Sequence, residues 1–119
     1  MARILLAEDD DSLRSFLALN LKRAGHEVEA YEDGDTAWAA LERGAFDLLL
    51  TDIVMPGLDG IELARRAAEH APHMKIVFIT GFAAVALSKA SAAPAQAKVL
   101  SKPFHLRDLV TEVERVIAA

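Results

Sequence analysis

The sequence predicts an α/β fold, a doubly wound parallel sheet of five strands with helices on both faces. Short apolar runs of strand length alternate five times with longer amphipathic segments along the 119 residues, which is the pattern of repeated strand–helix units. Residues 48–50 are an unbroken run of Leu, typical of a strand buried on both faces of a parallel sheet. The length suits one domain, so we expect a single unit over residues 1–119 with no output domain.

Composition and charge exclude several classes of function. Hydrophobic residues make up 53% of the chain, aromatic residues only 6%, and the formal net charge is −5. The negative charge argues against nucleic acid as a partner. The absence of Cys argues against disulfides and thiolate metal sites, and no apolar run approaches the ~20 residues of a membrane span. We therefore expect a cytoplasmic protein that binds neither nucleic acid nor membrane.

The first strand–helix unit is expected at the N-terminus. Residues 4–7 form an apolar strand, and four acids follow at positions 8–11. Asp11 and Ser12 offer side-chain oxygens that could cap a helix, and Gly25 would end it. The spacing of apolar residues predicts an inward face for that helix made of Leu13, Phe16, Leu17 and Leu21.

The other elements follow from the same patterns. Alternating polarity predicts an edge strand at residues 27–31, and apolar runs predict strands at 48–52, 75–79 and 98–101. Amphipathic spacing predicts helices at residues 35–43, 61–70 and 106–117, the first with Ala37, Ala40 and Leu41 facing inward. Residues 82–97 are Ala-rich and interrupted by Pro94, and we expect a weak helix with a long loop there.

Polar residues collect where the predicted strands end. Because the strands are parallel and neighbours lie ~4.8 Å apart, residues at their C-terminal ends share one edge of the sheet. That edge would carry Glu8, Asp9, Asp52, Thr80 and Lys102. Open α/β sheets bind ligands in the crevice where the strand order reverses. If the order is 2-1-3-4-5, the crevice lies between the first and third strands, where the carboxylates are.

The residue types at this edge indicate phosphoryl chemistry assisted by a divalent cation. Three convergent carboxylates repel one another unless a cation joins them, and oxygen ligands without His or Cys suit Mg²⁺. Thr80 and Lys102 could bind the oxygens of an arriving phosphoryl group. Pro56 and Gly57 predict a turn after Asp52, since Pro lacks a backbone N–H and Gly admits positive φ. Asp52 is the expected nucleophile, because this turn opens the space in front of it. Taken singly, each of these residues could be only a helix cap, a turn residue or a surface charge. The hypothesis of a phosphoryl site depends on all of them meeting at one edge.

With these residues in place, the chain resembles the receiver domain of two-component response regulators, the CheY-like family with its flavodoxin-like fold. The motifs that carry the resemblance are residues 4–10, 52–60, 80–81 and 101–104. The resemblance implies that Asp52 accepts a phosphoryl group from a histidine and that Mg²⁺ is held by Glu8, Asp9, Asp52 and the backbone carbonyl of Val54. It also implies that Thr80 and Lys102 bind phosphoryl oxygens, and that Lys102–Pro103 is a cis peptide.

The chain departs from the family pattern at two places. Val99 stands where the family's switch aromatic would fall, three residues before Lys102. Val54 and Phe82, two residues beyond Asp52 and Thr80, offer no polar group to orient an attacking water. We therefore expect slow spontaneous dephosphorylation and a switch that does not use a rotating aromatic side chain.

A narrower resemblance, over residues 3–11, 51–56, 78–87 and 99–109, is to stand-alone receivers of the alphaproteobacterial cell cycle. It implies a histidine phosphotransferase or sensor histidine kinase as phosphodonor and the ClpXP protease as partner. We expect the donor to dock on the surface of the first helix, where Arg14 and Leu17 would lie near the pocket. The chain would then be a phospho-acceptor with at most self-catalysed phosphotransfer and dephosphorylation. The alternatives are a phosphorelay shuttle between histidines and a small Mg²⁺-dependent phosphatase that uses Asp52 as its nucleophile.

Overall fold

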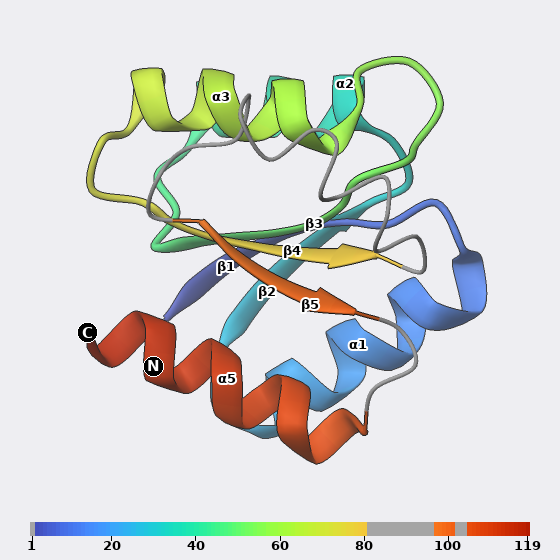
Figure 1. Cartoon of the computed structure of the whole chain (residues 1–119), viewed down its shortest axis with the longest axis vertical. Helices are drawn as coiled ribbons and strands as arrows, with labels where there is room; N and C mark the ends of the chain where they lie inside the picture. The colour runs from blue at the N-terminus through green and yellow to red at the C-terminus, as the bar shows by residue number, and fades with distance from the viewer. Residues whose placement is uncertain (1, 81–96, 102–104) are drawn as a thin grey trace.

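The computed structural model describes residues 2–80, 97–101 and 105–119 (Figure 1). In chain order the elements are β1 (Arg3–Ala7), α1 (Asp11–Arg23), β2 (Glu27–Tyr31), α2 (Gly34–Arg43), β3 (Leu48–Asp52), α3 (Gly60–His70), β4 (Lys75–Thr80), β5 (Lys98–Ser101) and α5 (Leu106–Ala118). The prediction for residues 82–97 falls almost entirely outside the described residues.

The sheet has the predicted topology. Its five strands run in the order β2-β1-β3-β4-β5, and every neighbouring pair is parallel. Helices α2 and α3 cover one face of the sheet, and α1 and α5 cover the other (Figure 1). The strand order reverses between β1 and β3, so the C-terminal ends of these two strands form the topological switch point of the sheet.

Alternating side chains of the central strand fill two separate cores. Leu49 packs with the residues of α2 and α3, whereas Leu48 and Leu50 pack with those of α1 and α5. Every residue of β3 is buried, which is why its sequence reads as a continuous apolar run rather than an alternating one. Asp52, the last residue of β3, is therefore anchored by a strand that is held on both faces.

Two details of the predicted first helix were wrong. The cap is Asp10, whose Oδ1 accepts a hydrogen bond from the Leu13 N–H at 3.0 Å; Asp11 instead lies in the first turn, where its charge favours the helix N-terminus. Phe16 is 52% exposed, not inward-facing. The i, i+4, i+8 stripe through Leu17 and Leu21 sets the inward face, and Phe16 lies about one quarter-turn away from it.

Nothing in the described part of the chain forms a helix with the length and apolar character that a membrane crossing requires.

Candidate functional site

Three carboxylates converge at the sheet edge between β1 and β3. In the parallel ladder Ala7 pairs with Thr51, so Glu8 and Asp52 both come one residue past the same rung. Carboxylate oxygens of Glu8, Asp9 and Asp52 all lie within 4.8 Å of one another. Glu8 is completely buried and Asp52 is 7% exposed, whereas Asp9 is exposed. The structure thus brings together the three side chains that the sequence assigned to the metal.

The loop after β1 is fixed by hydrogen bonds on several sides of Glu8. The Glu8 N–H donates to the Tyr31 carbonyl at 3.0 Å, and Glu8 Oε2 accepts from the Asp10 N–H at 3.0 Å. Arg14 Nη1 donates to the Glu8 carbonyl at 2.9 Å, while its Nη2 lies 2.6 Å from Asp11 Oδ1. These contacts hold the backbone and the carboxylate of Glu8 in one place before any ligand arrives.

This arrangement corrects the expected docking residues. The Arg14 side chain is only 18% exposed and is engaged with the β1–α1 loop, and Leu17 is fully buried. Leu17 therefore offers no surface to a protein partner, and Arg14 offers little. The large apolar side chains that α1 does expose are Phe16, at 52%, and Leu19, at 47%.

The loop after β3 is equally constrained. The Ile53 N–H donates to Asp52 Oδ1 at 2.7 Å and orients the carboxylate. The Gly60 N–H donates to the Ile53 carbonyl at 2.8 Å, and a Cβ at Gly60 would overlap the Asp52 carbonyl oxygen. Gly57 adopts φ +70°, the left-handed conformation that the Pro-Gly turn predicted. The Val54 side chain is 45% exposed, so it offers only an aliphatic surface beside Asp52.

The donor set and spacing fit Mg²⁺. An octahedral Mg²⁺ with ligands at about 2.1 Å separates its ligand oxygens by about 3 Å to about 4.2 Å. One carboxylate oxygen from each of Glu8, Asp9 and Asp52 lies within 4.8 Å of the other two. Small side-chain rotations would bring these oxygens to the separations that Mg²⁺ requires. Two buried carboxylates beside a third also carry mutual repulsion that a divalent cation would neutralise.

Of the remaining predicted site residues, Thr80 lies at the end of the neighbouring strand β4. Asp52 pairs with Ile79 in the ladder between β3 and β4, so Thr80 lies one rung beyond Asp52 on the adjacent strand. Lys102, the Lys102–Pro103 peptide and Phe82 lie outside the described residues. Val99, in place of the switch aromatic, is 45% exposed on β5.

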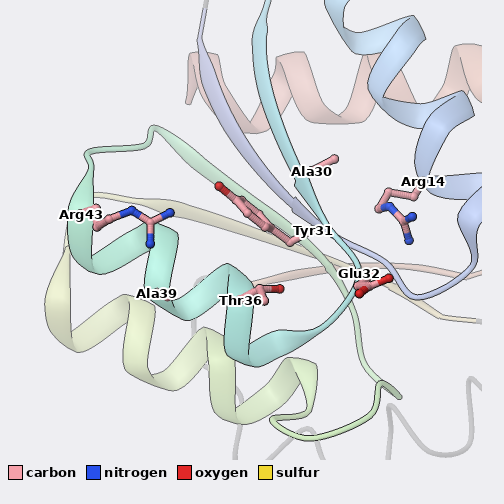
Figure 2. A pocket seen from close by; sticks show the side chains of 7 residues that line it. All are labelled: Arg14, Ala30, Tyr31, Glu32, Thr36, Ala39 and Arg43. Carbon is pink, nitrogen blue, oxygen red and sulfur yellow. The ribbon is translucent and has the colours of Figure 1, made fainter.

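A separate cavity of about 380 Å³ lies at the edge of the sheet, between α1, β2 and α2 (Figure 2). Figure 2 shows Tyr31 and Arg43 on one side of it and Arg14 with Glu32 on the other. The Tyr31 hydroxyl donates to Glu29 Oε1 at 2.9 Å. That hydrogen bond, burial and the Glu29 charge raise the pKa of Tyr31, against a smaller opposing effect of Arg43. Glu8, Asp9 and Asp52 are not in its lining, so we assign the functional site to the carboxylate cluster at the ends of β1 and β3.

The carboxylate cluster and the strand order are both features of one class of protein. The family description "Response regulator receiver domain" matches residues 4–114, and the chain belongs to this family. The crystal structure of a response regulator receiver protein from Sinorhizobium medicae WSM419 is similar, with a TM-score of 0.91 and 38% identity over 98% of this chain and 94% of that one.

Among individual proteins, the chain is similar to the response regulator receiver protein CpdR of Brucella abortus (strain 2308). The two are 60% identical over 119 residues, which covers 100% of this chain and 99% of CpdR. The crystal structure of the receiver domain from the hybrid histidine kinase CckA is also similar, with a TM-score of 0.83 and 32% identity over 97% of this chain and 98% of that one.

Proposed function

We propose that the chain is a single-domain response regulator whose Asp52 accepts a phosphoryl group and thereby switches a protein-binding surface. The observation that supports this most strongly is the carboxylate cluster, with oxygens of Glu8, Asp9 and Asp52 within 4.8 Å of one another at the topological switch point. Membership of the receiver family supports the same role.

In the proposed reaction an Asp52 carboxylate oxygen attacks the phosphorus of a phosphohistidine. The new P–O bond forms as the P–N bond breaks, and the imidazole leaves with the electron pair of that bond. The Ile53 N–H, 2.7 Å from Asp52 Oδ1, holds the carboxylate in a fixed orientation. Glu8, Asp9, Asp52 and the Val54 carbonyl would hold Mg²⁺, which supplies charge neutralisation for the phosphoryl oxygens. Thr80 and Lys102 are proposed to bind those oxygens.

The proposed phosphodonor is a histidine phosphotransferase or sensor histidine kinase that docks on α1. Phe16 and Leu19 are three residues apart and therefore neighbours on the helix surface, and both are about half exposed. An exposed apolar pair of this kind on the helix that follows β1 suits a helical partner. Downstream, we propose ClpXP as the partner whose proteolysis the switch controls, as the narrower sequence resemblance implies.

The phosphatase alternative is disfavoured by Val54. Aspartyl-nucleophile phosphatases usually use a second acid two residues beyond the nucleophile, and here that position exposes an isopropyl group. The same observation supports slow loss of phosphate from Asp52, because nothing polar at Val54 orients a water. A phosphorelay shuttle shares every site residue and differs only in passing the phosphoryl group onward to a second histidine.

Labelling with acetyl phosphate tests the acceptor. Wild type should incorporate phosphate with Mg²⁺ and lose incorporation in EDTA, and Asp52→Asn should incorporate none. The matched control is Glu69→Gln, which removes the charge of an exposed acid on α3; it should be labelled like wild type. Labelling of Asp52→Asn would refute the assignment. A phosphoryl lifetime of seconds with Mg²⁺ would refute the expectation of slow hydrolysis.

Two comparisons test the partners. Phe16→Ala should slow transfer from a phosphorylated histidine phosphotransferase about ten-fold or more, as loss of an interface anchor does, and leave labelling by acetyl phosphate unchanged. For the output, ClpX pull-downs should differ between Asp52→Asn and the beryllofluoride-treated wild type. Equal capture by the two forms would remove the proposed switch, and onward transfer to a second histidine would favour the shuttle.

A further inference from the structure

The N-terminus of α2 contacts the loop that follows the phospho-acceptor strand. Asp35, the second residue of α2, is exposed, and its Oδ2 accepts a hydrogen bond from the Leu58 N–H at 3.3 Å. The two residues are 23 positions apart, and their hydrogen bond joins the start of α2 to the β3–α3 loop. The hydrogen bond is therefore a tertiary contact and not part of the local structure of α2.

Glycines on both sides make this approach possible. A Cβ at Gly34 would overlap the Leu58 carbonyl oxygen, and a Cβ at Gly57 would overlap the Asp35 carboxylate. Gly57 is also at φ +70°, where side-chain-bearing residues are strained. The start of α2 and the tip of the loop thus meet at backbone distance, with the Asp35 carboxylate between them.

The other contacts of the loop explain what this one adds. The loop is closed at its base, where the Gly60 N–H donates to the Ile53 carbonyl, and Met55 anchors one flank because it is 7% exposed. The Asp35 hydrogen bond fixes the opposite flank at Leu58. Val54, whose carbonyl is the proposed metal ligand, lies in the same loop, between Ile53 at its base and the buried Met55.

We propose that Asp35 is a positioning residue: it holds the β3–α3 loop in the shape that presents the Val54 carbonyl to the metal. This inference rests on the proposed function, and it assigns Asp35 no contact with the metal or the phosphoryl group. It makes Mg²⁺ affinity depend on a hydrogen-bond acceptor at the start of α2.

The helix dipole of α2 offers a competing explanation for any loss of Mg²⁺ affinity in an Asp35 variant. An acid in the first turn stabilises a helix through its charge, and Asp35 is such an acid. Asparagine separates the two roles, because it keeps an oxygen that can accept from the Leu58 N–H but carries no charge. If Asp35 positions the loop, Asp35→Asn should rescue the function that Asp35→Ala loses.

The test is calorimetric Mg²⁺ binding to wild type, Asp35→Ala and Asp35→Asn. Loss of a residue that hydrogen-bonds directly to a metal ligand typically weakens metal affinity about 10- to 100-fold. Asp35 contacts Leu58 rather than a metal ligand, so we expect a smaller loss of about three- to ten-fold in Mg²⁺ affinity for Asp35→Ala. Asp35→Asn should stay within about two-fold of wild type. Glu42→Ala, which removes another exposed acid from α2, should bind like wild type. Unchanged affinity in Asp35→Ala, or equal losses in both Asp35 variants, would overturn the proposal.

Hydrogen exchange of the Leu58 amide provides a readout that does not depend on the metal. Its protection should fall in Asp35→Ala and persist in Asp35→Asn; unchanged protection in Asp35→Ala would overturn the contact itself. Absence of Mg²⁺ binding by wild type would instead overturn the proposed function together with the role of Asp35 in it. The two failures are therefore distinguishable in one set of samples.

Discussion

Replacing Asp52 with Asn should stabilise the fold when Mg²⁺ is absent. Carboxylate oxygens of Glu8 and Asp52 lie within 4.8 Å of each other and both residues are buried. Two unit charges at that distance repel by about 3.5 kcal/mol at an effective dielectric constant of about 20. Asn removes the charge and keeps an oxygen for the Ile53 N–H. Because neighbouring groups offset part of the repulsion, we expect the free energy of unfolding to rise by about 1–3 kcal/mol.

Urea unfolding in EDTA and in Mg²⁺ measures this change. In EDTA the Asp52→Asn variant should be the more stable protein. Mg²⁺ at about 100 times its dissociation constant adds about 2.7 kcal/mol to wild type and less to the variant, so the difference should shrink or reverse. Glu69→Gln, at an exposed position of α3, should change stability by no more than about 0.5 kcal/mol in either buffer, as surface substitutions usually do. An Asp52→Asn variant less stable than wild type in EDTA would refute the reasoning.

Three further predictions concern individual contacts seen in the structure. Gly60→Ala places a Cβ against the Asp52 carbonyl and should cost about 1–3 kcal/mol in urea unfolding; a cost near zero would contradict the close approach. The pKa of Tyr31 is raised chiefly by Glu29, so the stability this contributes is complete below pH ~10 and lost as pH rises through the folded pKa. Glu29→Gln should move the tyrosinate absorbance titration to lower pH, and an unmoved titration would contradict that cause. Asp33 caps α2 and its pKa is lowered by hydrogen bonds from Thr36, so Asp33→Ala should cost about 1 kcal/mol at neutral pH. That cost should fade as pH drops through the folded pKa of Asp33, and a pH-independent cost would count against the cap.

Much of the architecture was predictable because the signals are local. The Leu run at residues 48–50 predicted the buried central strand, and the Pro-Gly turn predicted the left-handed Gly57. The grouping of Glu8, Asp9 and Asp52 followed from one topological rule, that parallel strands end at the same edge. The helix cap was missed because Asp10 and Asp11 are adjacent in a run of acids, and either could cap the helix. The exposure of Phe16 was missed because its position differs from the inward face of the helix by only part of a turn.

The supporting contacts could not be predicted in the same way. Arg14 reads as a surface cation in the sequence, and only the structure shows it donating to the Glu8 carbonyl. The contact between Asp35 and Leu58 spans 23 residues and depends on how α2 packs against the β3–α3 loop. Glycines at positions 34, 57 and 60 were visible as turn signals, but the backbone approaches they allow exist only in the folded chain.

The most direct test of the central claim is to identify the phosphorylated residue. The protein would be treated with acetyl phosphate and Mg²⁺, the acyl phosphate reduced with borohydride, and the peptides sequenced by mass spectrometry. The proposed function predicts conversion of Asp52 to homoserine in wild type, with no conversion in EDTA. Modification of any other carboxylate, or none in wild type, would contradict it.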